Sequence, residues 1–495
     1  YFRMHLQSWL KNWVRENPKS TGETYDIYRD GLRVYTTIDS RLQENAEDAM
    51  ESHLSNLQAA FFRQQKQDSN PTAPFIDLEL EQVEEIVDRA MRNSDRWRSL
   101  RAQGKSDTLI KASFYVPTEM TVFDWKAPSK ERDTVMTPYD SILYYKSHLR
   151  GALMSIEPQT GHIKAWVGGA DYKHFQYDNV VQGARQVGST FKPFVYAAAI
   201  DQLRMSPCDR LPDVPYCVSP GRHGNIEAWC PKNSGGKYSG ESITLKHALA
   251  NSINTVTAQL IDRVGPASVV SVAERLGIES RIPAVPAIAL GTPDIKVFDL
   301  VSAYSTFANQ GVHTTPTFVT RIEDESGNVI YEAIPETRDV FNKEIAYTMI
   351  SLLKGVTEAG SGVRLRHNWM IDNPVYQEVV TGYPYEFKNP IAGKTGTTQN
   401  QSDGWFMGMV PNLATGVWVG AEDRAVHFDN ITYGQGATMA LPVWANYMRE
   451  SYNDSIGVSS EDFIRPDQIS INLLCNEANQ VIREEKSEDL EEFDF

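Results

Sequence analysis

The chain has 495 residues and is 41% hydrophobic, an ordinary globular composition with room for roughly three domains. Its formal net charge of −16 argues against a nucleic-acid partner, which would need a basic face, and gives no attraction to anionic lipid. No apolar run approaches a membrane span and no signal peptide is visible; because the chain starts at Tyr1, we expect a piece of a longer protein.

The N-terminal elements are predicted from periodicity. Residues 1–25 form an amphipathic helical pattern that ends near Asn17-Pro18, and residues 32–39 alternate as a strand. Residues 40–66 predict a helix. We therefore expect a linker of one strand and one helix over residues 1–50.

A charged stretch follows a break rich in Pro and Asn. Residues 78–104 carry apolar side chains at helical spacing among many charges. Runs of charged residues usually form solvent-exposed faces. We therefore expect an accessory, mostly helical or mixed region over residues 51–150. The alternative is that this stretch binds a partner.

The order of elements in the remainder predicts an α+β domain over residues 151–450. Strand-like runs at 152–156 and 162–167 are joined by a turn, and helical segments fill 189–280 and 341–358. Strand patterns return at the end of the domain, at 391–399, 404–411 and 415–421. Strands first and last with helices between them favour an antiparallel sheet with helices packed on it. Residues 451–495 are expected to be a C-terminal extension whose acidic tail, Glu484 to Asp489, is disordered.

Three short motifs lie in this domain in a fixed order. They are Ser189-Thr190-Phe191-Lys192, Ser252-Ile253-Asn254 and Lys394-Thr395-Gly396. The last occurs once, whereas Ser-x-x-Lys and Ser-x-Asn each occur four times, so each motif alone is weak evidence. The other copies begin at Ser8, Ser234 and Ser351, and at Ser326, Ser451 and Ser470.

The surrounding sequence distinguishes Ser189 from the serines of the other Ser-x-x-Lys copies. A turn-like approach ending in Gly188 leads into an apolar helical run, with Pro193 in the first turn where it is tolerated. Lys192 is three residues on, over the same helix face as Ser189. By contrast, Ser234 lies in a Gly-rich loop, and Ser351 lies inside an apolar helix.

A phosphate-binding loop is the obvious competing interpretation of Gly393-Lys394-Thr395. That loop needs a glycine five positions before its second glycine. Position 388 is lysine, so the sequence excludes it.

With these motifs the chain resembles the transpeptidase domain of class A, bifunctional penicillin-binding proteins. The resemblance covers most of the chain outside residues 51–115. It is carried by Tyr35 to Gln43, Arg185 to Tyr196 (with Val187 where Pro is usual), Trp229-x-Pro231-x-Asn233, Thr244 to Asn254, Ala289-Leu290-Gly291, Ala303 to Gly311, Asp403 to Phe406 and Gly416 to Gly420.

The resemblance implies a penicillin-binding, serine β-lactamase-like fold and a peptidoglycan D,D-transpeptidase. The donor would be a stem peptide ending in D-Ala-D-Ala, the acceptor an amine on a second stem, and β-lactams would mimic the donor end. It further implies an upstream membrane anchor and glycosyltransferase module that this chain does not contain, a periplasmic location, and other cell-wall synthesis proteins as partners.

The same reading assigns a role to each motif residue. Ser189 is the nucleophile and Lys192 its base, with the pKa of Lys192 lowered by burial and by Lys394. Ser252 relays the proton to the leaving nitrogen, and Asn254 holds Lys192 and the substrate amide. Lys394, Thr395, Gly396 and Thr397 bind the substrate, its terminal carboxylate above all, and the backbone N–H groups of Ser189 and Thr397 form the oxyanion hole. Trp229, Tyr383, Tyr385 and Trp405 are candidates for the cleft wall, although aromatic side chains more often fill cores.

Other functions use parts of the same pattern. A D,D-carboxypeptidase or β-lactamase-like hydrolase would use water in place of the amine. A β-lactam sensor or scaffold would keep Ser189 without turnover. The linker match to bifunctional synthases favours transfer.

The four cysteines leave two possibilities open. Cys208, Cys217 and Cys230 cluster, whereas Cys475 is remote. A disulfide between Cys217 and Cys230 and a set of unpaired thiols are equally compatible with the sequence. Metal-ligand spacings such as Cys-x-x-Cys are missing, so we expect neither a metal nor a cofactor.

Overall fold

The computed structural model describes residues 1–67, 70–368 and 370–475. The acidic tail predicted at Glu484 to Asp489 lies outside the described residues.

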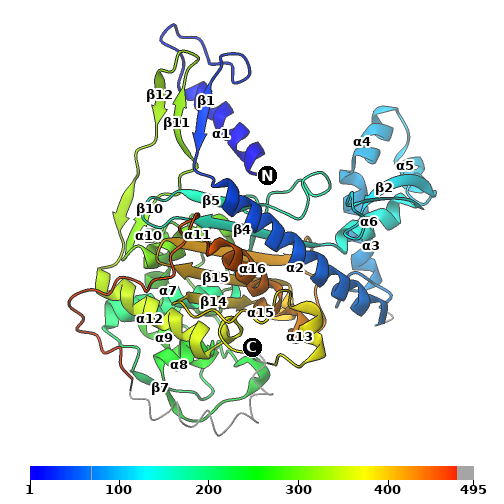
Figure 1. Cartoon of the computed structure of the whole chain (residues 1–495). Helices are drawn as coiled ribbons and strands as arrows, with labels where there is room; N and C mark the ends of the chain where they lie inside the picture. The colour runs from blue at the N-terminus through cyan, green and yellow to red at the C-terminus, as the bar shows by residue number, and fades with distance from the viewer. Residues whose placement is uncertain (68–69, 369, 476–495) are drawn as a thin grey trace.

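A five-stranded antiparallel sheet forms the centre of the molecule (Figure 1). Its order is β14 (Ala392–Thr397), β15 (Asp403–Val410), β16 (Leu413–Ala421), β4 (Leu149–Ile156) and β5 (Ile163–Val167). The chain thus begins and ends the domain in one sheet, and the prediction of an α+β fold is confirmed. β14 is an edge strand, so one side of its backbone is free of strand partners.

Alternating side chains of the sheet belong to two separate hydrophobic cores, one on each face. In β15, Trp405, Met407 and Met409 point into one core, and Phe406 and Val410 into the other. This alternation follows from the two-residue period of a strand, and it requires helices on both faces. Strands buried on both faces are accordingly apolar almost throughout.

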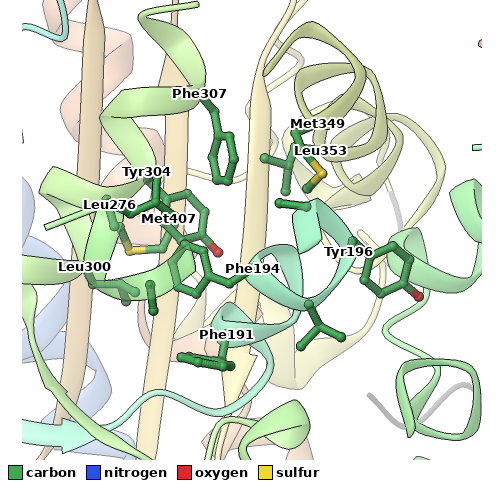
Figure 2. Packing of buried hydrophobic residues seen from close by; sticks show 14 of the residues in the cluster. Phe191, Phe194, Tyr196, Leu276, Leu300, Tyr304, Phe307, Met349, Leu353 and Met407 are labelled. Carbon is green, nitrogen blue, oxygen red and sulfur yellow. The ribbon is translucent and has the colours of Figure 1, made fainter. Parts of the chain in front are cut away.

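The first core lies under α7 (Lys192–Leu203), α9 (Asn254–Val264), α11 (Val297–Ala308) and α12 (Lys343–Ala359). In α7 every residue from Lys192 to Ile200 is buried, as expected for a helix that is apolar all round. Phe194 packs edge-on against Tyr304 of α11 (Figure 2). This rigid packing holds the segment that carries the first motif.

The second core lies between the other face of the sheet and two helices. These are α2 (Ser40–Gln67) and α16 (Leu441–Ser451), which run side by side across the sheet (Figure 1). The helix predicted at 40–66 is therefore confirmed, and it is a structural layer of the domain rather than a separate linker helix.

The N-terminal segment builds a projection from the main body. α1 (Phe2–Glu16) packs its aromatic side chains on a three-stranded sheet of β1 (Arg33–Thr36), β11 (Val319–Glu323) and β12 (Val329–Glu332). Ser326 lies at the tip of the hairpin between β11 and β12, so this copy of Ser-x-Asn is a turn.

The accessory region forms a second projection (Figure 1). The stretch predicted as helical over 78–104 is two helices that meet at Ser94, whose side chain accepts from the Trp97 N–H and so caps the second helix. A hairpin that the periodicity did not reveal follows them. The elements are α3 (Leu80–Asn93), α4 (Asp95–Ala102), α5 (Asp107–Ser113), β2 (Thr118–Phe123), β3 (Glu131–Met136) and α6 (Pro138–Lys146).

Short elements connect the larger ones. The short helices are α8 (Leu245–Ala250), α10 (Pro266–Arg275), α13 (Pro374–Val379), α14 (Ile431–Gly434) and α15 (Gly436–Met439). Two-stranded pairs join β6 (Ala184–Gln186) to β9 (Asp294–Lys296), β7 (Arg210–Pro212) to β8 (Ser242–Thr244) and β10 (Val312–Thr314) to β13 (Thr337–Asp339). In the described part of the chain, no helix is both long and apolar enough to cross a membrane.

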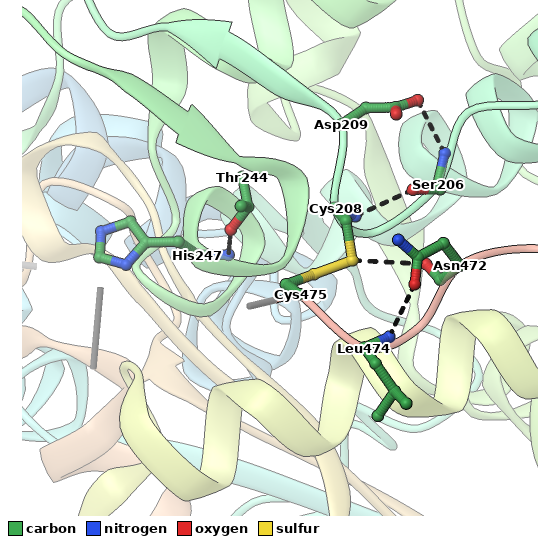
Figure 3. The surroundings of a disulfide bond; sticks show 8 residues. All are labelled: Ser206, Cys208, Asp209, Thr244, His247, Asn472, Leu474 and Cys475. Carbon is green, nitrogen blue, oxygen red and sulfur yellow. Dashed lines mark hydrogen bonds between the residues drawn. A yellow bond between two sulfur atoms is a disulfide. The ribbon is translucent and has the colours of Figure 1, made fainter. Parts of the chain in front are cut away.

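All four cysteines are paired. Cys217 and Cys230 close a short loop, and Cys208 joins Cys475 across 267 positions of the sequence (Figure 3). The second bond fastens the segment after α16 to the loop that follows α7. Glu344 of α12 accepts from the Ile471 N–H at 2.9 Å, and Lys354 pairs with Asp462, so this C-terminal segment also crosses α12.

Candidate active site

The first motif lies on a tight turn ahead of α7. Gly188–Phe191 form a single 3-10 turn, and Ser189 is half-buried at its start. Gly188 has a φ of +54°, and its N–H donates to the Gly291 carbonyl at 3.0 Å. A Cβ at Gly291 would lie 1.7 Å from the Gly188 carbonyl oxygen, so only glycine fits there.

The segment before the turn is fixed to the sheet. Arg185 in β6 pairs with Asp403 of β15 at 2.7 Å, and the Trp405 indole donates to the Gln186 carbonyl at 2.8 Å. Trp405 is fully buried and Tyr385 is 6% exposed, so both of these cleft-wall candidates are core residues. Trp405 therefore helps to hold the segment that leads into the turn with Ser189.

Lys192 meets the second motif inside the protein. Its fully buried Nζ donates to Ser252 Oγ at 3.0 Å, to Asn254 Oδ1 at 2.6 Å and to the Ser252 carbonyl. Burial, and then the charge of Lys394, lower the pKa of Lys192 well below its usual value. The hydrogen bonds of the described residues do not include one between Ser189 and Lys192, which are three positions apart along the turn.

The second motif occupies a strained turn between α8 and α9. Ser252 has a φ of +57°, a conformation that costs free energy in a non-glycine residue and is concentrated at functional sites. Asn254 begins α9, and its Nδ2 donates to the Lys232 carbonyl at 2.7 Å. Asn233 accepts from the backbone N–H groups of Asn254 and Thr255, so the segment that precedes β8 anchors this turn.

Trp229 and Tyr383, the other two aromatic candidates, are both half-buried. Trp229 pairs with Val218 in a backbone bridge inside the disulfide-closed loop and packs against the first core. Tyr383 packs against the second core.

The third motif lies on the edge strand β14. Lys394 is fully buried, and its Nζ donates to Ser252 Oγ at 3.1 Å. Burial lowers the pKa of Lys394 to about 7. Ser252 Oγ therefore stands between two amines, Lys192 and Lys394, in an arrangement that can pass a proton.

The other residues of β14 face the nucleophile turn or nearby donors. A Cβ at Gly396 would lie 2.8 Å from both Thr190 Cγ2 and the Val187 carbonyl, so glycine lets the turn approach the strand. A Cβ at Gly188 would lie 2.6 Å from the Thr397 carbonyl oxygen, so the backbone of Thr397 faces Ser189's turn. The Thr397 hydroxyl accepts from the Gly436 N–H at 3.0 Å.

One residue of the site was missed from the sequence. Ser361 follows α12, and its hydroxyl is 2.5 Å from the Thr395 hydroxyl. The only sequence signal is the run Gly360-Ser361-Gly362 directly after a helical pattern, which predicts a turn and not a contact with β14.

Comparisons with known proteins agree with this geometry. The sequence profile of the penicillin-binding protein transpeptidase domain matches residues 151–440, and that of the penicillin-binding protein middle domain matches residues 70–149. Penicillin-binding protein 1A of Aquifex aeolicus is 30% identical over 475 residues, covering 93% of this chain and 58% of the relative. Penicillin-binding protein 1A of Neisseria gonorrhoeae is 34% identical over 307 residues, covering 61% of this chain and 36% of the relative. The chain therefore spans about half the length of such relatives.

Solved structures share the fold. Penicillin-binding protein 1A from Haemophilus influenzae has a TM-score of 0.62 at 20% identity, covering 94% of this chain and 71% of that one. The penicillin-binding protein PonA1 from Mycobacterium tuberculosis has a TM-score of 0.60 at 20% identity, covering 94% and 93%. A second structure of PonA1, in complex with penicillin V, has a TM-score of 0.56 at 21% identity, covering 90% and 91%.

Proposed function

The chain belongs to the penicillin-binding proteins that carry a transpeptidase domain, and from this premise we propose that it is a D,D-transpeptidase that cross-links peptidoglycan stem peptides through an acyl-enzyme at Ser189. We further propose that it acts as part of a bifunctional cell-wall synthase and that β-lactams acylate the same serine. The relatives named penicillin-binding protein 1A support this assignment over a hydrolase or a sensor.

One observation carries the proposal. Ser252 Oγ lies 3.0 Å from Lys192 Nζ and 3.1 Å from Lys394 Nζ, so residues from all three motifs meet although they are separated by up to 202 positions. Two buried amines on one hydroxyl, with a serine on a helix-entry turn three residues before Lys192, support an acyl-transfer site. A structural role alone gives no reason to bury two lysines side by side, because each loses its hydration.

The first step is attack by Ser189. Lys192, kept neutral by burial and by Lys394, accepts the hydroxyl proton as Ser189 Oγ bonds to the carbonyl carbon of the penultimate D-alanine. The resulting ammonium has three N–H groups, and Asn254 Oδ1, Ser252 Oγ and the Ser252 carbonyl offer three acceptors. The site thus suits Lys192 after it has taken the proton.

The oxyanion is stabilised by backbone donors. The N–H groups of Ser189 and Thr397 are the candidates, since the close approach of Gly188 to Thr397 brings their segments together. Removing one such donor typically raises the barrier by about 2.7–4 kcal/mol.

Collapse of the intermediate releases the terminal D-alanine. Lys192 returns a proton to Ser252, and the Ser252 hydroxyl gives its own proton to the leaving nitrogen as the carbon–nitrogen bond breaks. The acyl group then passes to the amine of a second stem peptide by the reverse sequence, which gives a peptide cross-link and free Ser189.

The terminal carboxylate of the donor would bind at β14. The positive charge of Lys394 attracts the carboxylate, and the hydroxyls of Thr395 and Thr397 on β14 donate hydrogen bonds to it. In a β-lactam the carboxylate lies about as far from the strained amide as the terminal carboxylate of the donor peptide lies from its scissile amide. This similarity supports acylation by the same route. The solved PonA1 structure with penicillin V supports it by similarity of fold.

The compartment follows from the cysteines. Two disulfides persist in oxidising environments and are rare in reducing ones. We therefore propose an extracytoplasmic location, at the periplasmic face of the membrane.

The test is covalent labelling with a fluorescent penicillin. The native chain should give a labelled band that Ser189→Ala abolishes, whereas Ser351→Ala, a second Ser-x-x-Lys serine inside α12, should label normally. The proposal would be contradicted if the folded native chain gave no labelled band, or if the labelled band persisted in Ser189→Ala. Incubation with a D-Ala-D-Ala donor and an amine acceptor then separates transfer from hydrolysis by the product formed.

A further inference from the structure

The turn Gly360-Ser361-Gly362 contacts two of the three motif segments. The Ser361 N–H donates at 2.9 Å to the carbonyl of Ala250, two residues before Ser252, and the Ser361 hydroxyl meets the Thr395 hydroxyl at 2.5 Å. Building on the proposed function, we infer that Ser361 is a positioning residue, which aims the Thr395 hydroxyl proton at the carboxylate of the bound donor.

The direction of the hydrogen bond carries the inference. A hydroxyl has one proton and two lone pairs, so only one of the two hydroxyls can donate along their contact. If Thr395 donates to Ser361, it has no proton for a ligand. If Ser361 donates, the Thr395 proton is free, and an incoming carboxylate, which can only accept, selects this arrangement.

The neighbouring threonine has the same arrangement. Thr397 lies two residues along β14 from Thr395, so both side chains point to one face of the strand. The Gly436 N–H donates to Thr397 Oγ1, which leaves the Thr397 proton free. When Ser361 donates to Thr395, each hydroxyl on this face accepts a hydrogen bond at its oxygen, and the pair presents two protons to the two oxygens of a carboxylate.

Burial makes the contact effective. Ser361 and Thr395 are each 6% exposed, so water competes little for their hydroxyls. Hydrogen bonds polarise one another in such surroundings, and a Thr395 oxygen that accepts from Ser361 is the stronger donor for it.

The backbone of Ser361 cannot turn away. A Cβ at Gly360 would lie 2.2 Å from the Ala250 carbonyl oxygen, so the turn is pressed against the end of α8. Thr357, one turn earlier in α12, provides a natural comparison. Its hydroxyl donates to the Ile391 carbonyl at 2.7 Å and so also links α12 to the start of β14, but its hydrogen bonds end outside the motif.

The experiment compares acylation by benzylpenicillin with acylation by its methyl ester. Ser361→Ala should lower the rate of acylation by benzylpenicillin about 5- to 15-fold and the rate of acylation by the ester less than about 2-fold. Only the free carboxylate accepts the Thr395 proton that Ser361 orients. Ser361→Thr should restore the preference for the acid. Thr357→Val, which breaks a hydroxyl link between the same two elements, should leave that preference unchanged.

The outcomes separate the inference from the function. If neither compound acylates the native chain, the proposed function falls and the inference with it. If the native chain prefers the acid and Ser361→Ala slows both compounds equally, Ser361 is only structural while the function stands. Should Ser361→Ala not fold, Ser361→Cys keeps the volume and replaces a strong donor by a weak one, and an unchanged preference in it overturns the inference.

Discussion

At the scale of single residues, the two buried lysines divide their tasks by position. Lys192 is surrounded by three acceptors and can hold or release a proton, whereas Lys394 contacts Ser252 Oγ and its own strand. Burial, and then the positive charge of Lys394, lower the pKa of Lys192, whereas burial lowers the pKa of Lys394 to about 7. The proposed base for Ser189 must be neutral at working pH, and the lowered pKa of Lys192 favours that state.

This coupling predicts a shift in the pH profile of acylation. The rate should rise with pH as Lys192 loses its proton. In Lys394→Met the lost charge raises the pKa of Lys192, so the rising limb should move to higher pH, with a lower maximum. Lys394→Arg keeps the charge and should keep the limb in place. Stopped-flow acylation by a chromogenic β-lactam across pH measures both, and an unmoved limb in Lys394→Met would contradict the coupling.

At the scale of elements, the turn that carries Ser189, the proposed nucleophile, depends on three surrounding segments. β9 pairs with the strand that leads into the turn, and the Gly291 carbonyl accepts from the Gly188 N–H. The Trp405 indole of β15 donates to the Gln186 carbonyl, and β14 lies against Gly188. None of these contacts is local in sequence. The turn is therefore a product of the folded domain, and changes in distant glycines should alter the chemistry.

Gly291→Ala is the sharpest such change. The added methyl would stand 1.7 Å from the Gly188 carbonyl, so the turn that carries Ser189 must move. A displacement of about 1 Å can lower a rate about 100-fold, and we expect penicillin acylation to fall by at least that order. Gly235→Ala is the matched control, since Gly235 also has a positive φ but nothing lies within 4 Å of its Cβ position. Equal acylation rates in the two variants would disprove the role of Gly291.

The elements themselves were largely predictable. The helix at 40–66, the strands at 152–156 and 162–167 and the three C-terminal strands are confirmed because their periodicity and turn residues agree with their burial. The break at Ser94 was missed because a serine cap looks like an ordinary polar position in a charged helix. Similarly, Ser361 could not be assigned to the site, since its contact with Thr395 exists only when α12 packs against β14.

At the scale of the whole molecule, long-range links close the domain. β4 pairs with β16, which lies more than 200 positions later, and β5 pairs in turn with β4, while the bond between Cys208 and Cys475 spans 267 positions. Sequence spacing does not reveal the pairing of cysteines, which is why the partner of the remote Cys475 emerged only from the fold. Closing so long a loop restricts the unfolded chain strongly in the chain-entropy account of disulfides.

Buried histidines make the stability of this whole fold dependent on pH. Burial lowers the pKa values of His53, His148 and His313 to about 4, against 6.5 when exposed. Between these values the unfolded chain binds more protons than the folded one, so the free energy of unfolding should fall as pH falls from 6.5 to 4. For His53, which is fully buried and faces the charge of Arg364, the loss by pH 4 is on the order of 3 kcal/mol.

His53→Gln tests this at one position. Glutamine can donate to the Thr438 carbonyl, which His53 Nε2 contacts at 2.8 Å, but it does not titrate. The variant should be less stable than the native chain at pH 7.5, since the replacement disturbs a packed site, yet it should lose less stability on acidification. Urea unfolding at pH 7.5, 6, 5 and 4.5 gives both curves. Parallel curves would mean that His53 takes up its proton at the same pH in the folded and the unfolded chain, which would contradict the lowered pKa.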